Sequence, residues 1–126
     1  MLRTGIKGRA ELVVSPDKTA LNAGSGTLDV LATPSMTALM EQAAYTSVEP
    51  YLEEGSCTVG TYLEVSHDAP TPVGASVYAE SELIGIEGRQ LTFKVDAYDG
   101  RQRIGGGTHK RFIVNAERFR NKTYGK

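Results

Sequence analysis

Cysteine, histidine and tryptophan are scarce in this chain of 126 residues, which has one cysteine, two histidines and no tryptophan. The single Cys57 cannot form an internal disulfide, and two histidines provide no zinc-ligand spacing. We therefore expect Cys57 to be a structural thiol and the protein to hold no metal ion.

The sequence also lacks an excess of one charge and any long apolar run. Its 14 basic and 15 acidic side chains give a formal net charge of −1, and no basic block suggests a nucleic-acid partner. No segment approaches the roughly 20 apolar residues that span a bilayer, and the N-terminal "MLRTGIKGRAEL" lacks the apolar run of a signal peptide. We expect a soluble, cytoplasmic protein with no membrane or nucleic-acid partner.

One segment, "TPSMTALMEQAAYTSVEPYL" at residues 33–52, has the periodicity of a helix. Thr33 suits the N-cap position and Pro34 the first helical position, where a missing N–H has no cost. The predicted buried side of this helix consists of Met36, Leu39, Met40, Ala43, Ala44, Ser47, Val48 and Tyr51.

The rest of the chain is dominated by strand patterns, predicted at residues 6–14, 58–67, 74–86, 89–98 and 103–115. Residues 15–31 are rich in turn formers and predict a loop with a short helix. Turns at Glu87-Gly88 and Asp99-Gly100 join the last three strands into an antiparallel meander, and the connection after Pro70 must cross the sheet.

No internal repeat or linker divides the chain, so residues 1–126 are expected to form a single domain. One long helix and about five antiparallel strands predict an α+β fold in which the sheet wraps around a central helix. An open strand edge is a natural site for pairing with a second copy. We therefore expect a homodimer, and leave open whether dimers associate into a tetramer.

Three positions each have two interpretations, a chemical role and an ordinary structural role. His67 shares a strand face with Val59, Thr61, Leu63 and Val65, and is either a hydrogen-bonded core residue or a group that transfers protons. The carboxylate at position 41 lies at the boundary of the helix's apolar side, where many surface glutamates lie. The glycine at position 60 lies inside a strand and marks either a bulge or a close approach of the backbone to a ligand.

The order and spacing of these residues resemble a known family. The segments "ATPSMTALMEQA", "YLEEGSCTVGTYLEVSH", "TPVGASV", "EGRQLTFKVDAYDG" and "IGGGTHKRFIV" resemble the hot-dog-fold thioesterases, most closely the fluoroacetyl-CoA thioesterase family, from about residue 30 to about residue 119. The resemblance implies a hot-dog fold and a catalytic group of Thr33, Glu41 and His67 at a dimer interface. It also implies that the backbone N–H of Gly60 lies beside the thioester carbonyl and that Arg111 binds substrate.

The implied reaction is hydrolysis of a small acyl-CoA, with coenzyme A as part of the substrate and no separate cofactor. Such hydrolysis needs a nucleophile or an activated water, a proton shuttle and donors at the carbonyl oxygen. Glu41 is expected to be the base or the nucleophile, His67 the proton-transfer partner, and Thr33 the hydroxyl that orients them. The resemblance implies a longer apolar lid segment before the catalytic threonine in a fluoroacetyl-specific member, whereas this chain has the shorter, polar "TALNAGSGTLDV", so the acyl group stays open.

Two other functions remain alternatives. Hot-dog hydratases and dehydratases also place a histidine against a carboxylate, although their Asn-Pro motif is absent. A non-catalytic acyl-CoA-binding protein would keep the fold without the reaction. After the "GTH" segment, Lys110 and Arg111 either meet coenzyme A phosphates or are simply solvated, and His109 is expected to be structural or exposed.

Overall fold

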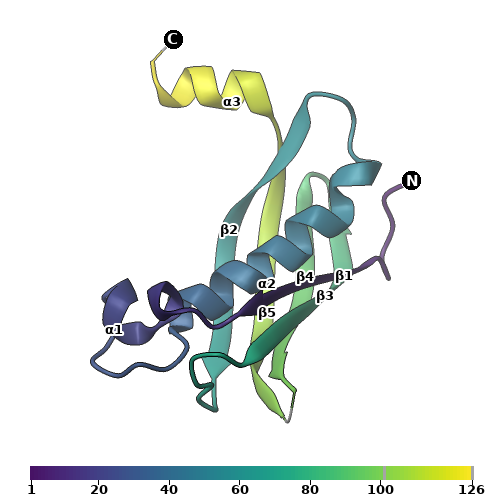
Figure 1. Cartoon of the computed structure of the whole chain (residues 1–126). Coiled ribbons are helices and arrows are strands. Elements are labelled where there is room, and N and C mark those ends of the chain that lie inside the picture. The colour runs from purple at the N-terminus through teal and green to yellow at the C-terminus, as the bar shows by residue number, and fades with distance from the viewer. Residues whose placement is uncertain (101, 126) are drawn as a thin grey trace.

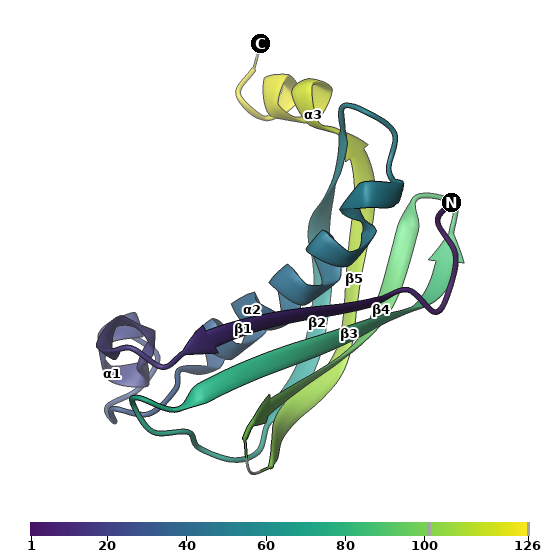
Figure 2. The same cartoon turned by 45° about the vertical axis from the view of Figure 1, so that its right-hand side comes forward.

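The computed structural model describes residues 1–100 and 102–125. Its centre is a five-stranded sheet in the order β1-β3-β4-β5-β2, in which every pairing between neighbours is antiparallel. The strands are β1 (Lys7–Val13), β2 (Ser56–His67), β3 (Ser76–Glu87), β4 (Gln90–Asp99) and β5 (Arg103–Asn115). The sheet is strongly curved, and the long helix α2 (Thr33–Val48) lies along its concave side (Figures 1 and 2). The predicted α+β fold is confirmed.

Helix α2 provides one side of the core. Six of its residues are buried: Met36, Leu39, Met40, Ala43, Ala44 and Val48. They pack against apolar side chains from the sheet, including Phe93, Val95 and Ile104. The small alanines allow the strands to approach the helix closely, and burial of this apolar surface is the main stabilising contribution to the fold. The end of the predicted face differs, since Tyr51 lies in the 3-10 turn η2 (Glu49–Tyr51) and is exposed.

The start of α2 lies one residue earlier than predicted. Ala32 occupies the N-cap position and makes no side-chain capping bond, so Thr33 is the first helical residue and Pro34 the second. The predicted capping role of Thr33 is therefore wrong. Its hydroxyl bonds elsewhere, because Thr33 lies inside the helix and not at the capping position.

The last three strands form the predicted meander, but the first turn lies one residue later than predicted. Glu87 pairs with Gln90, so Gly88 and Arg89 form the first loop, with Gly88 at φ 63°. At the second turn the backbone N–H of Asp99 donates to the carbonyl of Gln102 at 3.0 Å. That loop includes residue 101, which lies outside the described residues. The connection from β2 to β3 crosses the sheet as expected.

A bulge interrupts β2 between Gly60 and Tyr62. After the bulge, Leu63 and His67 pair with His109 and Gly105 of β5, and so point to the helix side of the sheet. Before the bulge the alternation is reversed, since Gly60 rather than Val59 faces this side. The prediction that Val59 and His67 share a face is therefore wrong, because one extra residue shifts the strand's alternation.

The chain has two peripheral helical parts. Residues 15–31 contain the 3-10 turn η1 (Pro16–Lys18) and the short helix α1 (Ala20–Ala23), as predicted. Helix α3 (Ala116–Thr123) was not predicted; it follows β5 directly, has no buried residue and projects away from the sheet (Figure 1). The side chain of Asn115 caps it by accepting the N–H of Arg118 at 2.9 Å.

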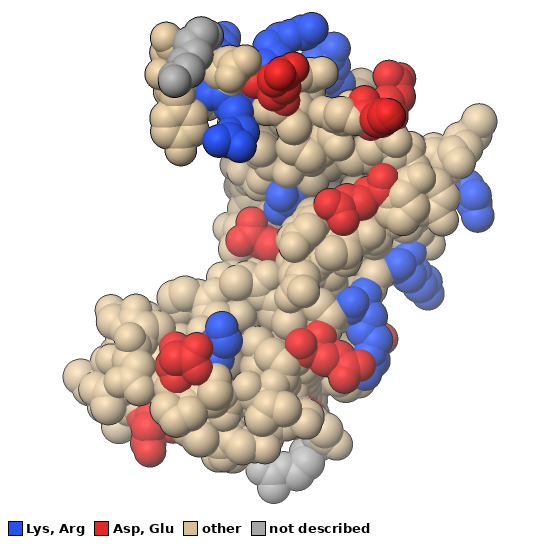
Figure 3. Space-filling model, turned by 45° about the horizontal axis from the view of Figure 1, so that its top comes forward, with Lys and Arg blue, Asp and Glu red and all other residues tan. Residues whose placement is uncertain are grey.

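On the face shown in Figure 3, acidic and basic side chains lie near one another in small groups separated by uncharged surface. Within the described part of the chain, no helix is both long enough and apolar enough to cross a membrane.

Candidate active site

The helix start and the end of β2 meet at a hydroxyl–imidazole pair. Thr33 Oγ1 lies 2.8 Å from Nδ1 of His67. The Thr33 side chain is exposed, whereas His67 is partly buried and its Nε2 is buried without a hydrogen-bond partner. Burial lowers the pKa of His67 below its usual value, although nearby Asp68 opposes the shift. The imidazole is therefore neutral near pH 7 and able to accept a proton.

An open cavity of about 250 Å³ lies beside this pair. It is large enough for a small acyl group and has both apolar and polar walls. Its lining residues are Ala20, Ser25, Val30, Leu31, Thr33, His67, Asp68, Ala69 and Pro70.

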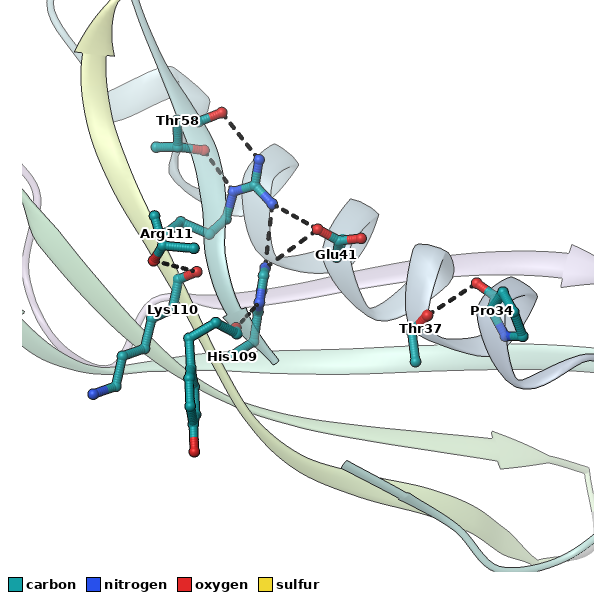
Figure 4. Close-up of polar contacts among 9 residues, drawn as sticks. Pro34, Thr37, Glu41, Thr58, His109, Lys110 and Arg111 are labelled. Carbon is teal, nitrogen blue, oxygen red and sulfur yellow. Dashed lines mark hydrogen bonds and ion pairs between the residues drawn. The ribbon is translucent and has the colours of Figure 1, made fainter. Parts of the chain in front are cut away.

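Glu41 lies two turns further along α2 and faces β5 rather than His67. Its Oε2 accepts a hydrogen bond from Nη1 of Arg111 at 3.4 Å, and lies 4.0 Å from Nε2 of His109 (Figure 4). The Glu41 side chain is 41% exposed. The carboxylate is therefore held at one oxygen, and the side chain remains partly accessible to solvent.

Gly60 lies directly beside that carboxylate. A Cβ built on Gly60 would lie 2.8 Å from Glu41 Oε2 and 3.3 Å from Nη1 of Arg111. The absence of a side chain therefore makes the space in which the Glu41 carboxylate lies. The bulge in β2 brings this about, since it turns position 60 toward the helix.

Arg111 is 7% exposed and is held from β2 as well as from α2. Its Nε donates to Thr58 Oγ1 at 2.7 Å, and its Nη2 donates to the Thr58 carbonyl at 3.0 Å. Burial lowers the pKa of Arg111, and the charge of Glu41 opposes this shift; arginine stays protonated in proteins. The guanidinium is thus directed at Glu41 and Thr58, while the half-buried Lys110 extends to the other side, 5.3 Å from the ring of Tyr62.

His109, expected to be structural or exposed, is buried between Arg111 and the sheet at 1% exposure. Its position next to Glu41 was not foreseen. The signal that could have found it is the alternation in "THKR", which puts positions 109 and 111 on one face of a strand. Which helix residue they meet depends on packing and is not visible in the sequence.

The candidate residues therefore form two groups within one chain. The first is Thr33 with His67, and the second is Glu41 with Gly60 and Arg111. Eight residues separate Thr33 from Glu41 on α2, which at about 1.5 Å per residue is about 12 Å along the helix axis. No hydrogen bond or ion pair links the two groups in the described part of the chain.

No group of three or more His, Cys, Asp or Glu side chains that could hold a metal ion occurs in residues 1–100 and 102–125.

The fold and the sequence define the chain first as a thioesterase of the hot-dog superfamily. A hypothetical protein from Thermus thermophilus, a thioesterase superfamily member, matches with a TM-score of 0.90 and 27% identity, over 98% of this chain and 92% of that one. The crystal structure of a fluoroacetyl-CoA thioesterase matches with a TM-score of 0.93 and 37% identity, over 100% and 98% of the two chains.

The family model for fluoroacetyl-CoA-specific thioesterases matches residues 14–117. The fluoroacetyl-CoA thioesterase of Streptantibioticus cattleyicolor is 38% identical over 127 residues, which cover 96% of this chain and 91% of that protein. The chain belongs to the fluoroacetyl-CoA-specific thioesterase family, and it is an acyl-CoA thioester hydrolase. One structure of a variant of the related enzyme contains fluoroacetate and CoA.

Proposed function

We propose that Thr33, Glu41 and His67 form the catalytic group of this thioesterase and that its substrate is a small acyl-CoA. The observation that carries the proposal is the 2.8 Å contact between Thr33 Oγ1 and His67 Nδ1. A threonine hydroxyl fixed on a neutral imidazole is arranged for proton transfer, and it borders a cavity of about 250 Å³.

In the proposed reaction, the Glu41 carboxylate takes a proton from a water molecule whose oxygen adds to the thioester carbonyl. The backbone N–H of Gly60 stabilises the negative charge that develops on the carbonyl oxygen. As the C–S bond breaks, Glu41 gives this proton to the neutral His67, and His67 and Thr33 pass it to the departing coenzyme A thiolate, which leaves the carboxylate and the imidazole as they began. Direct attack by Glu41 would instead give a mixed anhydride that water then hydrolyses.

The separation of about 12 Å along α2 supports a site that a second copy of the chain completes. β2 is an edge strand of the sheet, and residues 60–64 in its middle are exposed. An unpaired strand edge can pair with itself about a two-fold axis. If that axis passes near Leu63 and Glu64, Gly60 of one strand lies opposite His67 of the other. Glu41 and Gly60 of one subunit then complete the Thr33 and His67 pair of its partner in a cytoplasmic homodimer.

The proposed acyl group is small, as in the related fluoroacetyl-CoA enzyme. Residues 24–29, which lie near the Thr33 site, do not form an apolar cover over it. They are polar or glycine apart from Leu28, and all of them are exposed. We therefore expect the enzyme to accept several short acyl chains rather than fluoroacetyl-CoA alone.

The test is release of free thiol from a panel of fluoroacetyl-, acetyl-, propionyl-, branched and aryl-CoA esters. We expect turnover of short-chain esters, with loss of activity in Glu41→Gln and His67→Ala. Full activity in both variants, or no turnover of any ester, would refute the proposal. Crotonyl-CoA in the same panel distinguishes hydration, detected by loss of enoyl absorbance, from hydrolysis.

A further inference from the structure

The buried His109 has one hydrogen-bond partner on each side of its ring. Nδ1 lies 2.8 Å from the carbonyl oxygen of Tyr62, and Nε2 lies 3.2 Å from Nη1 of Arg111. A carbonyl oxygen only accepts hydrogen bonds and a guanidinium only donates them. Nδ1 must therefore carry the hydrogen, while Nε2 presents its lone pair to Arg111. Only one neutral tautomer satisfies both contacts.

A protonated imidazole would place an N–H of His109 against an N–H of Arg111. Burial and the positive charge of Arg111 both lower the pKa of His109, while its bond to the Tyr62 carbonyl and the charge of Glu41 oppose the shift. The 4.0 Å approach of His109 Nε2 to Glu41 is consequently not an ion pair. His109 influences the carboxylate only through the arginine between them.

The guanidinium is fixed along both of its edges (Figure 4). Thr58 accepts from Nε and Nη2, and Nη1 is shared between His109 Nε2 at 3.2 Å and Glu41 Oε2 at 3.4 Å. The His109 ring is itself packed against Phe93, with ring centroids 6.2 Å apart. Besides these groups, Tyr45 of α2 faces the guanidinium at 5.5 Å, and Cys57 of β2 lies close enough to act electrostatically. Nη1 thus reaches Glu41 from a direction set by His109.

We propose that His109 is a positioning residue for the catalytic carboxylate: its Nε2 lone pair holds Arg111 so that Nη1 keeps Glu41 Oε2 beside Gly60 and leaves Oε1 for the reacting atoms. This role rests on the proposed function of Glu41. It assigns His109 to the orientation of the site and not to proton transfer, since both of its ring nitrogens are already bonded inside the protein.

Two amide substitutions separate the two hydrogen bonds of His109. The amide nitrogen of Asn reaches the position of Nδ1, so His109→Asn keeps the donor to Tyr62 but provides no acceptor for Arg111. The amide of Gln reaches the position of Nε2, so His109→Gln offers Arg111 an acceptor and loses the donor to Tyr62. Each variant removes one buried hydrogen bond, which makes them a matched pair for stability.

We expect kcat of His109→Asn to fall at least roughly tenfold below that of His109→Gln, with KM of the two variants similar, because misdirection of a catalytic group lowers the rate of the chemical step. Circular dichroism establishes that both variants are folded at the assay temperature. Equal kcat values in the two folded variants would overturn the proposal.

A second measurement does not depend on activity or on any variant. The ¹⁵N chemical shifts of the His109 ring are expected to show a neutral imidazole protonated at Nδ1, unchanged between pH 7.5 and pH 5.5. A ring protonated at Nε2, or a cationic ring at pH 7.5, would contradict the proposal.

The activities of two variants distinguish failure of this proposal from failure of the proposed function. If Glu41→Gln is fully active, the catalytic assignment of Glu41 fails. If Glu41→Gln is inactive but His109→Asn equals wild type, only the positioning role fails.

Discussion

The carboxylate of Glu41 occupies the place that a side chain on Gly60 would take, with Oε2 only 2.8 Å from an ideal Cβ on that glycine. The two residues come from α2 and β2, and the bulge in β2 is what turns them toward each other. The geometry of the carboxylate therefore depends on a strand irregularity as well as on the helix that carries it.

Gly60→Ala tests this dependence. The new methyl group meets the end of a flexible side chain rather than backbone, so we expect the fold to survive and Glu41 to be displaced, with a loss of activity of about tenfold or more. The measurement is kcat/KM with the preferred acyl-CoA. Gly85→Ala is the matched control, because its Cβ would make an ordinary contact of 3.5 Å with Thr92. Equal activity in the two variants would contradict the prediction.

Thr33→Val removes the hydroxyl that lies 2.8 Å from His67 and keeps the side chain's shape. We expect activity to fall by about 100-fold or more, while the free energy of unfolding changes by about 0.5 kcal/mol or less because Thr33 is exposed and caps nothing. Thr37→Val is the control, since the Thr37 hydroxyl bonds only locally, to the Pro34 carbonyl at 3.0 Å. A Thr33→Val enzyme as active as Thr37→Val would count against a role for the hydroxyl.

The free energy of unfolding is expected to decrease as the pH is lowered below about 6.5, which is the ordinary pKa of histidine. The pKa values of His67 and His109 are both lowered in the folded protein, mainly by burial. Between the unfolded and folded pKa values the unfolded chain binds more protons, so the free energy of unfolding decreases as pH falls through this interval. Asp96, whose pKa is also lowered, acts at lower pH, below about 3.8.

Urea unfolding at pH 7.5 and pH 5.5, at one protein concentration, measures this effect. We expect a smaller free energy of unfolding at pH 5.5, and a smaller difference between the two pH values in His109→Gln. Unchanged or increased stability of the wild type at pH 5.5 would show that the histidines are not held neutral.

Close packing of β1 against α2 gives a prediction for the core. A Cβ on Gly8 would overlap the carbonyl oxygen of Ala43 and lie 2.7 Å from the Cβ of Ser47. Gly8→Ala is therefore expected to lower the free energy of unfolding by about 3 kcal/mol or more. Gly100→Ala, where a Cβ would meet nothing within 4 Å, is the control. Equal midpoints of unfolding for the two variants would show that α2 lies further from β1.

The sequence was most informative where a regular pattern persists over many residues. The spacing from Met36 to Val48 predicts α2 and its buried face, because helical periodicity is a local property. The meander was likewise predictable from its turns. The exact position of the first loop was not predictable from the sequence. Gly88, which has a positive φ, is the first residue of its two-residue loop, whereas the sequence pattern made it the second.

Features that depend on pairing between distant segments were less accessible. The bulge after Gly60 exists only relative to β5, so the sequence alone kept Val59 and His67 on one face. The burial of His109 and the direction of Arg111 depend on the register of β5 against β2 and on the packing of α2. Helix α3 is short and mostly polar and has no buried residue, so it offers no broad apolar face of the kind that predicts a packed helix.

We propose that each thioester is hydrolysed by Thr33 and His67 of one subunit together with Glu41 of its partner. The most direct measurement mixes two inactive variants, Glu41→Gln and His67→Ala, under conditions in which native mass spectrometry shows exchange of subunits. With equal amounts of the two variants, about half of the dimers contain one copy of each. Each such mixed dimer has one intact site and one inactive site, so we predict recovery of roughly a quarter of wild-type activity. A fully exchanged mixture that stays as inactive as each variant alone would contradict the claim.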